Sequence, residues 1–477
     1  MEVGNVYECV VDRLNHQGKG ICLVDSRVVF VSDCLPGERV KIKIDHVSKK
    51  FVSGVVIDRL SDSSSRVDVN CPYYSSCGGC DIMHMSYSFQ HDFKFNKVTD
   101  IIRKFVHEDI KINEVDFDEQ FYYRNKATFH IKEGIGFYKD KTYDLIDIDK
   151  CLISSIEINS ILSVLKKMNL NNVESVVVRS SHFDKSVMVI FSVVGKIDEG
   201  YLIDSLKDIV SSIYIKKDKY RLIYGDEYIV DKIGDLKFVI SPDSFFQVNT
   251  PMAYKLYSKV RDYAGNLDDF NVLDLYCGTG TIGLFVGGKS LVGVEINESA
   301  IHDANINKDL NNISNCKFIC GDSGKVLKGL DKNFDVVIVD PPRSGLSELS
   351  INEVIGVGAN RVVYVSCDPV TLARDLNIFK EFYDIKEISL FDLFPNTNHV
   401  ENVCLLVKKL WKKCYFLMEV AFSFIGAEKF WIAVINIGWY ITKFVIGLLI
   451  LEIIICLFLM IYILILLKIF LLFVLYV

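Results

Sequence analysis

The pattern of hydrophobic and polar residues changes twice along the chain. In the first 60 residues, short apolar runs such as VVFV and VKIKI alternate with polar residues and are separated by glycines. Several short strands at this spacing predict a small, OB-like β-barrel. The Ser-rich stretch 61–66 resembles a linker, and residues 61–240 then mix a helix-like segment near 89–106 with strand runs such as SVMVIFSVV. We therefore expect a barrel at 1–60 and a mixed α+β central domain at 61–240.

From residue 241 onward, strand and helix signals alternate. The strand runs are NVLDLYC, LVGVEI, CKFICGD, FDVVIVDPP and RVVYVSC, and helix-length stretches separate them. This alternation is typical of a doubly wound parallel sheet of the Rossmann-like kind. The last strand, NVCLLVKK, ends near Lys409. The predicted fold class is thus α/β, with a C-terminal doubly wound domain at 241–409.

The tail, residues 410–477, has a different character. Its last part, 445–477, carries only Glu452 and Lys468 as charged residues and is long enough to cross a bilayer core of ~30 Å. Two interpretations compete: a membrane anchor, or an artefact of the gene model such as a shifted reading frame. We favour the second, because nothing in the chemistry described below needs a membrane.

Composition narrows the function classes. With 477 residues and 50% hydrophobic content, the chain is neither disordered nor fibrous. The net charge of −7 does not mark a nucleic-acid binder, so RNA contact would depend on local charge such as the basic strands between Arg39 and Arg59. Those strands are equally typical of a solvated sheet face. Fourteen cysteines without a signal-like N-terminus favour a reducing cytoplasm over a disulfide scaffold.

The run VLDLYCGTGTIGL places a strand, a glycine loop and a helix start in order. Gly278, Gly280 and Gly283 satisfy G-x-G-x-x-G, which alone is a weak signal for a nucleotide cofactor. Asp274 lies just before the glycines, where its carboxylate would repel a pyrophosphate. It suits the cationic ammonium and sulfonium of S-adenosylmethionine instead.

Two further acids follow the next two strands. Glu295 ends the strand LVGVEI, where its carboxylate is placed to accept hydrogen bonds from ribose hydroxyls. Asp322, after the third strand, is a candidate for holding the adenine amino group.

The segment VVIVDPPRSGL places Asp340 after a buried strand, and the two prolines keep it out of the helical region. Its carboxylate is therefore predicted to face the crevice at the carboxyl end of the sheet, where ligands bind. Methyltransferases of exocyclic amines carry an aromatic residue where this chain has Arg343. The target is consequently predicted not to be an exocyclic amine.

The strand RVVYVSC delivers Cys367 to the same edge of the sheet. Uracil C5 is a poor nucleophile until a group adds to C6, and a thiolate is soft enough to add there and to leave afterwards. Glu401 lies at the start of the last strand, in FPNTNHVENV, and is placed to remove the C5 proton. His399 is interpreted as structural.

Cys71, Cys77 and Cys80 form C-x5-C-x2-C, and Cys151 is a candidate fourth ligand. Close thiolates suit a metal or a cluster. Spacing alone permits structural zinc as readily as iron–sulfur.

Taken together, these motifs resemble the RNA uracil-5-methyltransferase family, which includes enzymes that form 5-methyluridine in 23S ribosomal RNA and in the tRNA T-loop. The resemblance covers roughly 1–409. It implies S-adenosylmethionine as cofactor, Cys367 as nucleophile and Glu401 as base. Asp340 would lie at the cofactor and base pocket. Tyr276 and Glu295 would lie at the cofactor, and Gln247, in SPDSFFQVN, would contact cofactor or base.

The first 60 residues resemble a TRAM domain, which implies RNA binding by the basic strands. The four cysteines match the thiolates of the family's [4Fe-4S] cluster. Because members acting on the T-loop generally lack both features, 23S rRNA is favoured as substrate and tRNA stays an alternative. No obligate protein partner is implied.

Two hypotheses from other classes are an iron–sulfur, dinucleotide-dependent oxidoreductase and a non-catalytic RNA-binding scaffold. Asp274 and the DPPR segment argue against the first, and the second leaves Cys367 and Glu401 unexplained.

Overall fold

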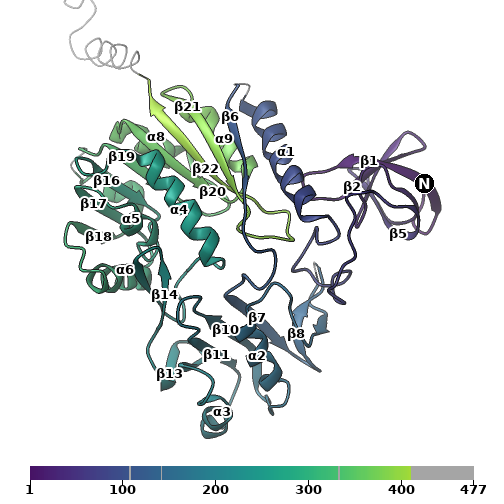
Figure 1. The fold of residues 1–477 in the computed structure, drawn as a ribbon, viewed down its shortest axis with the longest axis horizontal. Coiled ribbons are helices and arrows are strands. Elements are labelled where there is room, and N and C mark those ends of the chain that lie inside the picture. Colours follow the sequence, from purple (N-terminus) through teal and green to yellow (C-terminus); the bar gives the residue numbers. More distant parts are fainter. Residues whose placement is uncertain (107–108, 141, 331–332, 410–477) are drawn as a thin grey trace, which may run out of the picture. The chain divides into compact units, whose positions relative to one another are not determined.

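The N-terminal strands close into a barrel in the computed structural model, which describes residues 1–106, 109–140, 142–330 and 333–409 (Figure 1). Strands pair in the order β1-β2-β3-β5-β4, with β3 and β5 parallel. Alternate side chains of each strand fill the barrel core, as the alternating sequence pattern requires. The bounds are β1 (Val6–Leu14), β2 (Gly20–Val24), β3 (Arg27–Val31), β4 (Arg39–Val47) and β5 (Val52–Ser61). The predicted barrel is confirmed.

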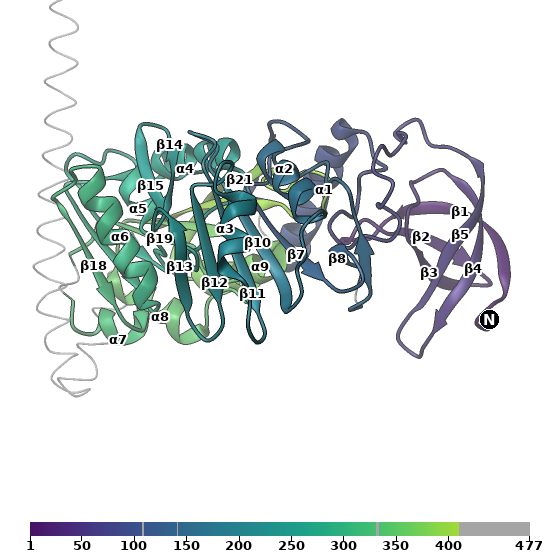
Figure 2. The same ribbon diagram turned by 90° about the horizontal axis from the view of Figure 1, so that it is seen from below.

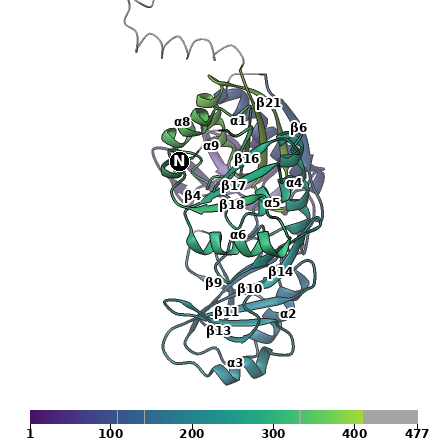
Figure 3. The same cartoon turned by 90° about the vertical axis from the view of Figure 1, so that its left-hand side faces the viewer.

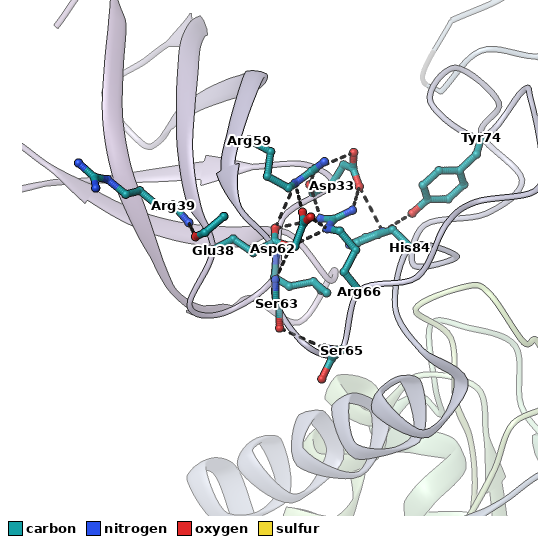
Figure 4. A network of polar contacts seen from close by, with 12 residues as sticks. Asp33, Glu38, Arg39, Arg59, Asp62, Ser63, Ser65, Arg66, Tyr74 and His84 are labelled. Atoms are coloured by element: carbon teal, nitrogen blue, oxygen red, sulfur yellow. Dashed lines mark hydrogen bonds and ion pairs between the residues drawn. The ribbon is translucent and has the colours of Figure 1, made fainter.

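A network of charged side chains joins the barrel to the segment that follows it (Figure 4). The Arg66 guanidinium donates to both carboxylate oxygens of Glu38, at 2.5 and 2.9 Å, and Glu38 is fully buried. Arg66 also bonds Asp33 at 3.0 Å, and Arg59 contacts the same two acids. Arg59, which the sequence placed on a basic RNA-facing strand, is therefore engaged inside the protein.

The central part is a seven-stranded sheet in the order β13-β12-β11-β10-β7-β8-β9, several strands of which are labelled side by side in Figure 2. Two amphipathic helices bury their apolar faces on it. The bounds are β7 (Lys126–Ile131), β8 (Ile135–Tyr138), β9 (Leu145–Asp147), α2 (Ile156–Leu165), β10 (Val173–Ser180), β11 (Val187–Val193), α3 (Glu199–Leu206), β12 (Ser212–Lys216) and β13 (Tyr220–Gly225). A hairpin of β14 (Ile229–Ile233) and β15 (Leu236–Ile240) follows.

The C-terminal part is an eight-stranded sheet in the order β18-β17-β16-β19-β20-β22-β21-β6. Strands β18, β17, β16, β19 and β20 are parallel, and β22 runs antiparallel to its neighbours β20 and β21. Figure 3 shows β16, β17 and β18 side by side. The bounds are α4 (Thr250–Ala264), β16 (Asn271–Leu275), α5 (Thr281–Val286), β17 (Ser290–Glu295), α6 (Glu298–Leu310), β18 (Cys316–Cys320), α7 (Ser323–Leu327), β19 (Val336–Val339), α8 (Glu348–Val357), β20 (Arg361–Ser366), α9 (Pro369–Phe379), β21 (Tyr383–Phe391) and β22 (Glu401–Lys408).

Helices cover both faces of this sheet. Buried residues of α4, α5 and α6 pack on one face, and those of α7, α8 and α9 pack on the other. The apolar runs of the parallel strands follow from this double burial. The α/β class predicted from the alternating signals is confirmed.

Helix α1 (Tyr87–Val106) and strand β6 (Lys111–Asp116) join this same sheet, although both precede the central sheet in sequence. β6 pairs in parallel with β21 and covers what would otherwise be an exposed edge (Figure 1). Helix α1 packs with α9 on the second face. The sequence from 61 to 240 thus contributes to two sheets.

Within the described residues, no helix combines the length and apolar character needed to span a membrane. The predicted hydrophobic tail at 410–477 lies outside those residues.

Candidate active site

Acidic and nucleophilic side chains gather at one edge of the C-terminal sheet. Asp274 lies near the end of β16, Glu295 ends β17, and Asp340 and Cys367 directly follow β19 and β20. Because these strands are parallel, their carboxyl ends share one edge. Glu401 begins the antiparallel β22, so its strand starts where the others end.

The glycine loop turns tightly around Asp274. The Gly283 N–H donates to Asp274 Oδ2 at 2.9 Å, and a Cβ at Gly283 would lie 2.7 Å from that oxygen. Gly280 has a φ of +76°, which favours glycine. The other carboxylate oxygen of the buried Asp274 has no hydrogen-bond partner among the described residues. An orphaned buried acceptor of this kind fits the cationic methionine end of S-adenosylmethionine.

The remaining predicted cofactor contacts lie around the same loop. The Glu295 carboxylate accepts from the N–H groups of Gly278 and Asn297, at 3.2 and 2.9 Å. Tyr276 has a φ of +63°, which is costly for a bulky residue and typical of functional sites. Asp322 is exposed and caps α7 by accepting from the Lys325 N–H at 3.1 Å. That cap explains Asp322 without a ligand.

Cys367 and Glu401 face each other across adjacent strands. Ser366 pairs with Asn402, and continuing this antiparallel register by one residue places Cys367 opposite Glu401. Glu401 is buried and Cys367 is half-buried. The structure therefore brings together the two residues that the sequence proposed as nucleophile and base.

Burial and like charge shift the ionisation of this group. Burial, with the charge of Glu401, raises the pKa of Cys367 to about 12. Burial, with the charge of Asp340, raises the pKa of Glu401 to about 8. Desolvation raises the pKa of Asp340 to about 7, and burial together with Asp340 raises that of Asp274 to about 8. Perturbed values at one sheet edge are typical of functional sites.

Arg343 is a candidate functional residue that the sequence analysis did not single out. Its positive charge lowers the pKa of Cys367 and of Glu401, against the effect of burial. The sequence argument used Arg343 only to exclude an aromatic residue. Its position directly after Asp-Pro-Pro, at the edge of the predicted crevice, is the signal that could have identified it.

A cavity of about 800 Å³ opens beside this edge and extends toward the cysteine group. Gln247, Arg343 and His399 line it on the catalytic side. Gln247 is buried, and its side chain hydrogen-bonds the hydroxyl of Tyr257, which in turn lies 3.3 Å from Thr281 at the start of α5. Gln247 thus lies on the catalytic side of the cavity, where the predicted contact with cofactor or base would be made.

The cysteines at 71, 77, 80 and 151 line the same cavity. Burial, with the charges of neighbouring thiols, raises the pKa of Cys80 and, less strongly, of Cys77. However, no group of three or more His, Cys, Asp or Glu residues in the described ranges is arranged so that it could hold a metal ion. The described residues therefore do not support the predicted [4Fe-4S] cluster or the zinc alternative.

Comparison with known proteins shows the family of this chain. A family model described as tRNA (Uracil-5-)-methyltransferase matches residues 86–409. This chain belongs to that family. A TRAM domain model matches residues 1–57, in agreement with the barrel. An uncharacterized RNA methyltransferase of Clostridium acetobutylicum is 35% identical over 445 residues, covering 84% of this chain and 97% of the relative. One of Halalkalibacterium halodurans is 34% identical over 452 residues, covering 85% and 97%.

Among solved structures, the tRNA (uracil-54, C5)-methyltransferase of Pyrococcus abyssi, in complex with S-adenosyl-L-homocysteine, is similar with a TM-score of 0.69. It is 29% identical, and the match covers 84% of this chain and 99% of that one. The chain is thus an S-adenosylmethionine-dependent RNA uracil-5-methyltransferase of the family, and the oxidoreductase and scaffold hypotheses are set aside.

Proposed function

We propose that this enzyme methylates C5 of a uridine held outside its base stack, with Cys367 as nucleophile and Glu401 as general base. The observation that carries the proposal is the opposition of these two residues across β20 and β22 at the cofactor edge of the sheet. Such a base must leave its stack to reach atoms inside the protein.

The reaction divides between the two side chains. Cys367 Sγ forms a bond to C6, and the C5=C6 electron pair moves to C5, which then takes the methyl group. S-adenosylmethionine, when bound, would supply that methyl group and be left as S-adenosylhomocysteine, and Asp274, Glu295 and Tyr276 would hold it. The Glu401 carboxylate removes the C5 proton, the electron pair re-forms C5=C6, and the C6–S bond breaks. No step passes through the four cysteines.

Arg343 has a distinct part in this scheme. Because burial holds the thiol of Cys367 protonated in the free protein, the thiolate needs a nearby cation. Arg343 provides one from the protein side, and it also favours the carboxylate form of Glu401 that the proton transfer requires.

The cavity supports RNA binding next to this chemistry. Its lining includes the cations Arg124, Lys126, Lys150 and Arg343, which suit phosphates. Phe245 lies at its border and is 66% exposed, so its ring is available to stack on a base. The barrel adds an exposed tip, where the stacked rings of His46 and Phe51 flank two lysines.

Two RNA substrates are candidates. 23S rRNA is the substrate predicted from the sequence. The likeness to a tRNA methyltransferase over nearly all of that protein's length favours tRNA as the second candidate. Mapping 5-methyluridine in both RNAs, with and without the gene, distinguishes them: the position that loses its methyl group is the target.

The roles of the two residues are tested by substitution. Cys367→Ala should abolish methyl transfer, and Glu401→Gln should accumulate a covalent RNA adduct visible on a denaturing gel. Cys316→Ala, at the far end of β18, is the matched control and should keep activity. A Cys367→Ala enzyme that still methylates RNA would contradict the proposal.

A further inference from the structure

The loop of residues 392–400, which connects β21 to β22, delivers Glu401 to the site. Phe391 and Glu401 pair directly, so the loop closes the end of this hairpin. Asn396 lies in the middle of the loop. It is fully buried, and its φ of +67° is tolerated by asparagine better than by most residues.

Asn396 is bonded by three segments that lie far from it in sequence. Its Oδ1 accepts from Gln90 Nε2 at 3.2 Å and from Gln120 Nε2 at 2.8 Å. Its Nδ2 donates to the Gln120 carbonyl at 3.0 Å, and its backbone N–H donates to Gln90 Oε1 at 3.0 Å. Its carbonyl accepts from the N–H groups of Asp81 and Ile82, at 2.9 and 3.1 Å. Each polar atom of Asn396 is therefore used to fix the loop.

The neighbouring residues of the loop are held in the same way. The Asp81 carboxylate accepts from the backbone N–H and the side-chain amide of Asn398, at 3.2 and 2.9 Å. Lys97 donates to the Asn398 carbonyl at 2.7 Å, and the Tyr123 hydroxyl donates to the Pro395 carbonyl at 3.0 Å. The loop thus takes its shape from outside partners.

We propose that Asn396 is a positioning residue that fixes the carboxylate of Glu401 for removal of the C5 proton. Asn396 does not touch the reacting atoms. It acts through the loop. A displacement of the loop moves Glu401, the first residue of β22, more than it moves Asn402, because the Asn402 side chain donates a hydrogen bond to the Ser366 carbonyl at 2.8 Å. Proton transfer requires hydrogen-bond reach, so a small displacement of Glu401 affects that step most.

The role can be measured as a ratio of two rates, and the measurement rests on the proposed function. Asn396→Gly removes the side-chain hydrogen bonds but keeps a residue that accepts a positive φ. With radiolabelled RNA that contains the mapped target uridine, adduct formation and adduct breakdown are timed on denaturing gels. We expect breakdown to slow on the order of 10–100-fold, with formation changing far less. Adduct therefore accumulates.

Asn172→Gly is the matched control. Asn172 has a φ of +65° but lies exposed in the central part, before β10, and this variant should behave like the parent protein. If Asn396→Gly does not fold, Asp81→Ala takes its place, because the exposed Asp81 can be truncated without opening a core. Its expected effect has the same direction and a smaller size.

Equal slowing of both steps, or unchanged breakdown, would overturn the positioning role while leaving the proposed function intact. Activity in Cys367→Ala would instead overturn the proposed function. The two failures are therefore distinguishable in one set of experiments.

Discussion

Lys94 and Asp392 form a buried ion pair that ties helix α1 to the stem of the 392–400 loop. Both side chains are fully buried, and Lys94 Nζ lies 2.5 Å from Asp392 Oδ1 and 3.2 Å from the Phe394 carbonyl. Lys94→Met keeps most of the side-chain volume and removes the charge. Asp392 then loses the lysine at 2.5 Å and keeps only the weaker contact with His91 Nε2 at 3.6 Å among its basic neighbours in the described residues.

The expected magnitude follows from the geometry. Two unit charges 2.5 Å apart attract by about 7 kcal/mol at an effective dielectric constant of 20. Much of this offsets the desolvation of both ions. Removing one partner leaves the other ion's desolvation uncompensated, and such changes cost about 3–5 kcal/mol. Lys94→Met with Asp392→Asn removes both charges, so the double variant should recover a large part of that loss.

Native-state hydrogen exchange, read on peptides from α1 and β22, measures the local free energy of opening without assuming one transition for the whole chain. Lys111→Met is the matched control, because Lys111 is 70% exposed and pairs with Glu387 at 2.8 Å. Exposed pairs contribute less than about 1 kcal/mol. A loss below that value in Lys94→Met, or a double variant no more stable than the single one, would refute the reasoning.

Three further predictions concern the ionisable groups. In the proposed mechanism Glu401 acts as a carboxylate and its pKa is raised to about 8, so kcat/KM for tritium release from C5-labelled RNA should rise steeply with pH up to about 8 and less steeply above it, where only the thiol of Cys367, with a pKa of about 12, still has to lose its proton; a flat profile from pH 6 to 9 would contradict this. Arg66→Met should lower exchange protection in the barrel by about 1–3 kcal/mol, because Glu38 loses its two hydrogen bonds to Arg66 but keeps Arg59 at 3.5 Å. Burial alone would raise the pKa of Glu38, but Arg66 lowers it. In the parent protein, the stability that the Glu38–Arg66 pair contributes is therefore lost as the pH falls and Glu38 takes up a proton. Lys126→Met should reduce the slope of log affinity for single-stranded RNA against log salt by about 0.7. Burial, with the charges of Arg179 and Arg124, lowers the pKa of Lys126 to about 8. The difference in salt slope between the variant and the parent protein should therefore be present at pH 6.5 and should shrink by pH 9.

The sequence predicted which residues share the candidate catalytic edge because strand ends are local features. Asp340 and Cys367 each follow an apolar run directly, and parallel strands place such positions along one edge. To predict that Cys367 lies opposite Glu401, one must also know that β20 and β22 pair in antiparallel orientation, and no local sequence pattern specifies that pairing.

Pairings across long sequence separations could not be predicted in this way. Lys94 is 298 residues from Asp392, and Gln90 is 306 residues from Asn396. In sequence, Lys94 resembles any lysine on an amphipathic helix, and only tertiary packing turns its position inward. The ion pairs of Arg59 could not be predicted either, because only the closed barrel brings Asp33 and Glu38 near it.

These long-range contacts explain why the segments that precede the catalytic sheet in sequence belong to its mechanism. Asp81 lies next to Cys80, and its N–H and carboxylate hold the loop that carries Glu401. The Tyr74 hydroxyl donates to the Asp81 carbonyl at 2.7 Å and lies 2.6 Å from His84 Nδ1, beside the barrel network (Figure 4). Hydrogen bonds thus connect the cysteine segment to the loop that precedes Glu401, and His84 lies 3.7 Å from Asp33 of the barrel. A change in the cysteine segment should therefore reach the C5 proton transfer through Asp81, even though no cysteine of that segment takes part in the chemistry.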